Sequence, residues 1–323
     1  MKAIARGHLG IGNVALLPRP SAISLLSQSG LTHLVLPLIM SPSPHEFTHN
    51  PRLPSDEDIV AHCKQLNFPR GTILADPSTS SVIAWIKCGP NVTVGEAQMQ
   101  HWTAIALREA GVSHVRAAPV FRAFEADDRG CSIGYIAMEY VEGIDCDSND
   151  VDLVAGAVEA LISLRAPPTA TLGYFGSGTS SIVHSFFLDW FPNANYRSDQ
   201  DFYDHIQKIF KLLSIDFDGD LSKYDRLLCP SDFDPGNFRK TTAPDGRSVV
   251  VVLDFRATCF MPLPFIEVAL KKDRDHFRRS LIAKTKYPQG RAEDVEALLS
   301  ASGRLVQYGT KPVALPPGVS PSI

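Results

Sequence analysis

The sequence has no acidic residue before Glu46, although Asp and Glu together number 35 among its 323 residues. An acid-free start fits a mitochondrial presequence, but the glycines and prolines between Gly7 and Pro20 interrupt the long amphipathic helix that such a signal needs. The apolar run from Leu31 to Met40 is too short to span a bilayer. We therefore predict an irregular extension over residues 1–45 and a cytoplasmic protein.

An excess of positive charge is also absent, since the formal net charge is -4. Nucleic acids and anionic membranes attract concentrated Lys and Arg, so neither is an expected partner. The six cysteines do not stand in the short pairs that zinc or thiol redox chemistry uses, and the ten histidines form no His-Glu-x-x-His pattern. With 44% hydrophobic residues, the composition is that of a globular intracellular protein with reduced thiols.

Residues 46–142 show the pattern of a small antiparallel sheet with helices. Apolar spacing predicts a helix over residues 56–66, with Ser55 as its N-cap, and a second helix over residues 95–110 that ends at Gly111. Alternation and turn residues predict two hairpins. Their strands are expected at residues 71–75 and 82–87, joined by the turn Asp76–Ser81, and at residues 120–125 and 131–140.

Residues 143–310 are mainly helical in pattern, with amphipathic segments at residues 151–165 and 201–213. One strand pair interrupts them, at residues 237–240 and 249–253 around a turn at residues 243–246. Residues 311–323 are rich in Pro, Gly and Ser and predict a surface tail. The whole is an α+β fold with two lobes that meet near residue 142.

Three polar residues near this strand pair have the chemistry of phosphoryl transfer. That reaction needs hard oxygen ligands for a metal and a carboxylate that receives the proton of the attacking hydroxyl. Asp232 stands five positions before Asn237, and the four valines Val249–Val252 lead to Asp254. Because the hairpin brings Asn237 and Asp254 together, both are expected to bind one metal, with Asp232 as the base. Taken singly, Asp232 and Asn237 also fit ordinary turns, and Asp254 fits a helix cap.

The Asp-x-x-Pro-Gly-Asn loop at residues 232–237, followed by the hairpin into Leu253-Asp254-Phe255, resembles the aminoglycoside phosphotransferase and choline kinase superfamily. The stretches at residues 254–260 and 301–309 are similar to a fungal branch of it whose substrates are largely undefined. The resemblance covers residues 71–303. It implies a bilobal protein-kinase-like fold and phosphorylation of a small-molecule hydroxyl with ATP and Mg²⁺.

The same resemblance assigns further residues. Lys87, at the end of its apolar strand, matches the lysine that holds the α- and β-phosphates, and Glu96 would pair with it. Glu96 equally fits a capping box with Thr93. The main chain around Glu139 and Val141 would bind adenine between the lobes. The turn Asp76–Ser81 would take the place of the glycine-rich phosphate loop.

Two departures from the family pattern leave alternatives open. Pro230-Ser231 stands where the family often has His-Gly, and the turn Asp76–Ser81 contains no glycine. Both favour a nucleotide-binding pseudokinase or scaffold as the second hypothesis. A protein kinase is the third, although the stretch after Asp254 lacks the expected activation-loop residues. The acidic residues of the 173–225 insert suggest a cationic, amine-bearing acceptor; they are Asp189, Asp201, Asp204 and Asp220.

Overall fold

The first described helix begins where the sequence predicted a cap. In the computed structural model, which describes residues 46–176, 181–272 and 275–322, α1 (Asp56–Gln65) follows Ser55, and the Ser55 hydroxyl accepts a hydrogen bond from the Asp58 amide at 3.2 Å. All of the described elements belong to one compact unit, Ile39–Ile323. The extension predicted over residues 1–45 lies outside the described residues.

The first sheet confirms both predicted hairpins. It is antiparallel, with the order β1 (Gly71–Ala75), β2 (Val82–Gly89), β5 (Cys131–Met138) and β4 (Val120–Asp128). On β2 the side chains of Ala84, Ile86 and Cys88 are buried in one apolar cluster with Ile59 and Cys63 of α1. Because side chains alternate along a strand, Trp85 and Lys87 point to the other face.

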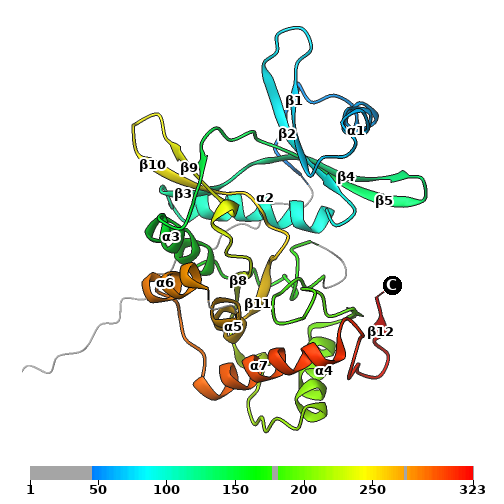
Figure 1. The fold of residues 1–323 in the computed structure, drawn as a ribbon, viewed down its shortest axis with the longest axis vertical. Coiled ribbons are helices and arrows are strands. Elements are labelled where there is room, and N and C mark those ends of the chain that lie inside the picture. The colour runs from blue at the N-terminus through cyan, green and yellow to red at the C-terminus, as the bar shows by residue number, and fades with distance from the viewer. Residues whose placement is uncertain (1–45, 177–180, 273–274, 323) are drawn as a thin grey trace, which may run out of the picture. The chain divides into compact units, whose positions relative to one another are not determined.

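Helix α2 (Val94–Glu109) packs against β4 and β5 of this sheet and against β3 (Val115–Ala117) of a second sheet (Figure 1). Thr93 caps it by accepting from the Glu96 amide at 3.1 Å. The helix gives way to Gly111, whose φ of +70° is in the left-handed region that favours glycine. This helix therefore lies between the two sheets and holds Glu96 in its first turn.

The second sheet joins the two halves of the chain. Its order is β3, β10 (Ser248–Val252), β9 (Phe238–Thr242) and β6 (Ile144–Asp145). The antiparallel β9–β10 hairpin was predicted, whereas the parallel pairing of β10 with β3 was not. Since β3 precedes residue 142 and β10 follows it, the predicted lobe boundary is crossed by a continuous sheet, and the two-lobed division stays a prediction.

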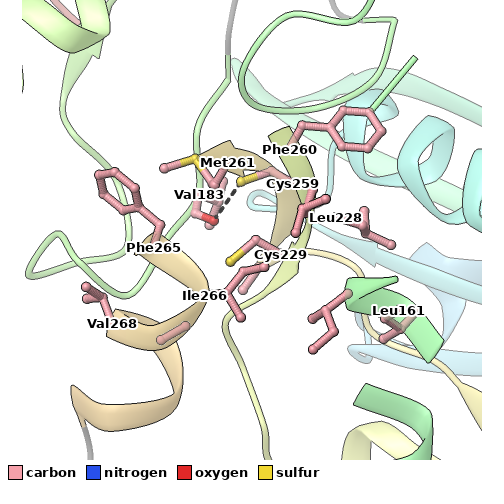
Figure 2. Packing of buried hydrophobic residues seen from close by; sticks show 14 of the residues in the cluster. Leu161, Val183, Leu228, Cys229, Cys259, Phe260, Met261, Phe265, Ile266 and Val268 are labelled. Atoms are coloured by element: carbon pink, nitrogen blue, oxygen red, sulfur yellow. Dashed lines mark hydrogen bonds between the residues drawn. The ribbon is translucent and has the colours of Figure 1, made fainter. Parts of the chain in front are cut away.

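The second half is mainly helical around one strand pair. Strands β8 (Arg226–Pro230) and β11 (Thr258–Pro262) pair antiparallel, which the sequence did not predict. Figure 2 shows the surrounding core, to which Leu161, Leu228 and Ile266 contribute. The helices are α3 (Val151–Ile162), α4 (Asp199–Leu212), α5 (Pro264–Lys272), α6 (His276–Lys284) and α7 (Ala292–Leu305), with short 3-10 turns η1 (Leu221–Lys223), η2 (Pro235–Asn237) and η3 (Val306–Tyr308).

The end of the chain is paired rather than loose. Strand β12 (Ser320–Pro321) pairs antiparallel with β7 (Ala194–Asn195), and Val319 is buried. The Pro- and Gly-rich composition of residues 311–323 gave no sign of this pairing. Within the described residues, no helix has both the length and the apolar character needed to cross a membrane.

Candidate functional site

A cavity of about 290 Å³ is lined by both sheets and by the segment that follows β5. Its wall contains five of the seven predicted site residues, namely Lys87, Glu139, Val141, Asn237 and Asp254. These residues are far apart in the sequence and come from β2, the 139–141 segment and the ends of the β9–β10 hairpin. Glu96 does not line the cavity but is bound to Lys87, which does. Asp232 lies outside the wall.

Lys87 is held by two carboxylates. Its Nζ lies 2.5 Å from Oε1 of Glu96 and 3.2 Å from Oδ1 of Asp254. The structure thus realises the predicted Lys87–Glu96 pair, while Thr93 caps α2 through the main chain of the same glutamate. A lysine fixed in this way presents one positive charge at the point where β2 and the β9–β10 hairpin meet.

Burial and charge oppose each other in this cluster. Burial lowers the pKa of Lys87, but Glu96 and Asp254 outweigh it, so the net pKa lies above the ordinary lysine value. Burial raises the pKa of Glu96, which is fully buried, against the opposing effect of Lys87. Lys87 therefore remains protonated at neutral pH.

Asn237 and Asp254 meet across the base of the hairpin. The amide of Leu253 donates to the carbonyl oxygen of Asn237 at 3.0 Å, which places Asp254 next to Asn237. No hydrogen bond among the described residues occupies the Asn237 side chain, whose Nδ2 is buried, so its amide oxygen is open to a cation. An amide and a carboxylate are the hard donors that Mg²⁺ takes, usually one or two from the protein beside phosphate and water. The residues present fit a magnesium ion.

The 139–141 segment leaves one acceptor and one donor free of other bonds. The Glu139 N–H donates to the Pro119 carbonyl at 2.9 Å, and the Val141 carbonyl accepts from Nη1 of Arg239 at 3.0 Å. Within the described part of the chain, no hydrogen bond occupies the Glu139 carbonyl or the Val141 N–H. The Glu139 carboxylate is bound to Arg116. A carbonyl and an N–H two residues apart can read the edge of a planar base.

Asp232 stands in a loop that is tied to β11. The Ser231 amide and hydroxyl both donate to the Ala257 carbonyl, at 2.8 and 3.0 Å, and Ser231 is fully buried. On the other side, Oδ1 of Asp232 accepts from the Asp234 amide at 3.2 Å. Ser231 thus anchors the loop in which the sequence has Pro230-Ser231 rather than His-Gly. Asp232 itself is only partly buried and can contact a ligand.

The turn Asp76–Ser81 is not where the resemblance placed it. In the β1–β2 register Ala75 pairs with Val82, whereas Lys87 pairs with Gly71 at the opposite end of the hairpin. Five strand residues at about 3.3 Å each put the turn roughly 16 Å from Lys87. In addition, Oδ1 of Asp76 accepts from the amides of Ser78 and Thr79, at 2.8 and 3.3 Å. The prediction of a phosphate loop here was wrong.

Trp85, Gly71 and Arg70 are among the cavity residues that the sequence reasoning missed. Trp85 lies on the Lys87 face of β2, and the two-residue period could have revealed it. Gly71 gives the indole room, since a Cβ there would lie 2.3 Å from Cζ2 of Trp85. Arg70, just before β1, brings an exposed guanidinium to the same wall. Gly71 and Arg70 could be found only from the strand register, which cannot be read from the sequence.

Most acids of the 173–225 insert already have partners. Asp201 is bound to Arg197 at 2.9 Å, Asp204 accepts from Gln200 at 2.7 Å, and Asp220 lies 3.3 Å from Lys223. Arg197 holds the pKa of Asp201 down at about 2. These contacts give the three acids local structural roles, and so weaken the prediction that they form a site for a cationic acceptor.

No family model and no curated protein matches the chain. Among solved structures, a microcompartment-associated aminopropanol kinase is 13% identical, with a TM-score of 0.37 over 78% of this chain and 99% of that one. A spectinomycin phosphotransferase with ADP and spectinomycin is 10% identical, with a TM-score of 0.37 over 77% and 84%. An ethanolamine kinase from Plasmodium vivax is 13% identical, with a TM-score of 0.37 over 78% and 79%. Likenesses this distant assign neither a family nor an activity to this chain.

Proposed function

We propose that the protein is an ATP- and Mg²⁺-dependent phosphotransferase of the aminoglycoside phosphotransferase and choline kinase type, acting on a hydroxyl of a small molecule. One observation carries the proposal. Lys87 is held by Glu96 and Asp254, in the same cavity wall as Asn237 and the 139–141 segment. A phosphate-binding cation, two hard oxygen ligands and a base-reading edge are the parts that nucleotide-dependent phosphoryl transfer needs.

Each residue has a defined task in this reaction. The Glu139 carbonyl and the Val141 N–H hydrogen-bond the adenine, and Lys87 holds the phosphates that precede the transferred one. Mg²⁺ at Asn237 and Asp254 would offset phosphate charge. Asp232 accepts the proton of the acceptor hydroxyl while that oxygen bonds to the γ-phosphorus, and the bond from that phosphorus to the β–γ bridging oxygen breaks to release ADP.

The second candidate function is a nucleotide-binding scaffold, and one observation favours it. The β1–β2 turn lies far from Lys87, so no loop of this hairpin closes over the phosphates there. A protein of this kind would bind Mg-ATP without efficient transfer. Mutations of Asp232 and Asp254 separate the two functions.

Asp232 and Asp254 should respond differently to loss of charge. Asp232→Asn removes a base that acts on the acceptor, so it should lower turnover about 10² to 10⁴-fold and leave Mg-ATP affinity nearly unchanged. Asp254→Asn removes a metal ligand and a Lys87 partner, so it should weaken both Mg-ATP binding and turnover. Calorimetric titration of ATP with and without Mg²⁺ gives the affinities, and ADP release across hydroxylated metabolites gives the turnover.

Asp234→Asn is the matched control, because this exposed aspartate is in the same loop and, among the described residues, its Oδ1 accepts only from the Gly236 amide. Equal ATP affinity with and without Mg²⁺ would remove the metal role of Asn237 and Asp254. Tight Mg-ATP binding by a wild type that phosphorylates no acceptor, with Asp232→Asn indistinguishable from it, would establish the scaffold.

A further inference from the structure

Arg256 is a partly buried arginine that forms no ion pair with a described residue, although its charge, like that of Lys87, opposes the rise that burial causes in the pKa of Glu96. No carboxylate of the described residues lies within ion-pair distance of its guanidinium, and its Nε is shielded from solvent with no hydrogen-bond partner there. The guanidinium lies over the ring of Phe191, 5.6 Å from the ring centroid. An aromatic face stabilises the charge but satisfies none of the N–H donors in the guanidinium plane. A buried donor left in this way is destabilising unless a ligand completes it.

The main chain of Arg256 is fixed on both sides. Its amide donates to Oδ1 of Asp254 at 3.0 Å, and its carbonyl accepts from the hydroxyl of Tyr174. The side chain is therefore anchored within two residues of the proposed metal ligand. Arg256 does not line the nucleotide cavity, whereas Asp254 does. Its guanidinium lies over Phe191 of the 173–225 insert, and Tyr174 of the same insert binds the Arg256 carbonyl.

Arg256 also lies beside the proposed base. Pro230 of β8 pairs with Thr258 of β11. One residue further along, the Ser231 amide donates a hydrogen bond to the carbonyl of Ala257. The residues that follow this hydrogen bond on the two segments are Asp232 and Arg256. A carboxylate and an unpaired guanidinium thus leave the strand pair at the same end, outside the nucleotide cavity.

We propose that Arg256 binds an anionic group of the acceptor, a hydroxy acid or a phosphorylated alcohol, and so presents the acceptor hydroxyl to Asp232. This inference rests on the proposed function and deepens it. It replaces the cationic acceptor expected from the acidic insert, three of whose four acids have partners of their own. A planar guanidinium fits carboxylate and phosphate groups through two parallel hydrogen bonds.

Inorganic phosphate serves as the probe for this site, titrated into the full chain with and without an excess of Mg²⁺ and a non-hydrolysable ATP analogue. Arg256→Gln should weaken phosphate binding roughly 10- to 100-fold, the worth of hydrogen bonds to a charged group. Arg256→Lys should recover part of it. Arg129→Gln, in the exposed β4–β5 turn, is the control that removes equal charge and should bind phosphate like the wild type.

The second arm compares kcat/KM for glycerate, glycerol and 3-amino-1,2-propanediol, which differ in charge but share hydroxyl groups. Glycerate should be preferred, and Arg256→Gln should abolish that preference while leaving Mg-ATP affinity unchanged. Phosphate binding that survives Arg256→Gln would overturn the proposal. Loss of Mg-ATP affinity in Arg256→Gln would also overturn it, because the anion would then be the transferred phosphate. A wild type that binds phosphate through Arg256 but never binds Mg-ATP would refute the phosphotransferase and leave the anion site standing.

Discussion

Ser231 fixes the start of the Asp232 loop, where the sequence departs from the pattern of the superfamily that it resembles. In the sequence, Pro230-Ser231 is one of the two departures that favour a pseudokinase or scaffold. In the structure, two hydrogen bonds from Ser231 to one carbonyl, that of Ala257, fix the start of the Asp232 loop. The hydroxyl is one of these donors and is fully buried. Its contribution to stability and to the placement of Asp232 can therefore be separated by mutation.

Ser231→Ala should lower the free energy of unfolding by about 1 kcal/mol, the typical net worth of one hydrogen bond. It should also reduce turnover several-fold through the looser Asp232 loop, with Mg-ATP affinity unchanged because the nucleotide cavity excludes this residue. Urea denaturation and steady-state kinetics provide the two readings. Ser280→Ala, in α6, where the hydroxyl also donates to a main-chain carbonyl but is only partly buried, is the matched control. Identical kinetics for Ser231→Ala and wild type would show that the tie does not position the base.

At the scale of elements, the two ends of the β1–β2 hairpin differ in whether they can contact the phosphates of a bound nucleotide. At one end Arg70 and Gly71 line the cavity beside Lys87. At the other, the Asp76 carboxylate takes the amides of Ser78 and Thr79 that a bound phosphate would otherwise use. We therefore expect the affinity for the nucleotide to depend on the beginning of β1 and not on the turn.

Arg70→Gln should weaken Mg-ATP binding about tenfold, because it removes an exposed positive charge from the cavity wall. Ser78→Ala, in the turn of the same hairpin, should leave that affinity within about twofold, although it removes a 2.6 Å bond from the hydroxyl to Asp76. Calorimetry on both variants measures the difference. The reverse order of effects would restore the turn as the phosphate loop.

Local pattern predicted those elements that local interactions form. Ser55 caps α1 and the turn at Gly246 closes the β9–β10 hairpin, so both could be read from neighbouring residues. The parallel pairing of β3 with β10 and the β8–β11 pair depend on partners far along the chain, which no short window contains. For the same reason the motif residues Asn237 and Asp254 were found, whereas Arg70 and Arg256, whose settings follow from register and packing, were not.

At the scale of the whole molecule, a buried histidine makes the stability of the fold depend on pH. His184 is fully buried, and its Nδ1 accepts from the Phe186 amide at 2.9 Å while its Nε2 lies 3.1 Å from the Phe265 carbonyl. This arrangement uses a neutral ring whose proton is on Nε2. Burial lowers the pKa of His184 to about 3. The core around α5 and β8 therefore excludes the charged form.

The sign of the pH effect follows from linkage. An unfolded histidine takes up a proton near pH 6.5, whereas His184 in the fold does so only near pH 3. The unfolded state thus binds more protons between these values, so the free energy of unfolding should fall as the pH is lowered. One such proton amounts to about 1.4 kcal/mol per pH unit, or roughly 2 kcal/mol between pH 6.5 and 5.

His184→Gln should be less stable than wild type at pH 7, because it disturbs the two hydrogen bonds of the ring, yet its stability should fall less steeply with acid. Urea denaturation at several pH values between 5 and 7 measures both slopes, and their difference should approach one proton. His49→Gln, which removes an exposed histidine, should keep the wild-type slope. If His184→Gln kept it too, the buried ring would be protonated in the fold, and the core would have to supply a counter-charge or acceptor for it. The described surroundings offer only the Phe265 carbonyl and the Cys229 thiol at 3.5 Å to Nε2, and Nδ1 already accepts a hydrogen bond, so the neutral ring is the form that this packing can hold.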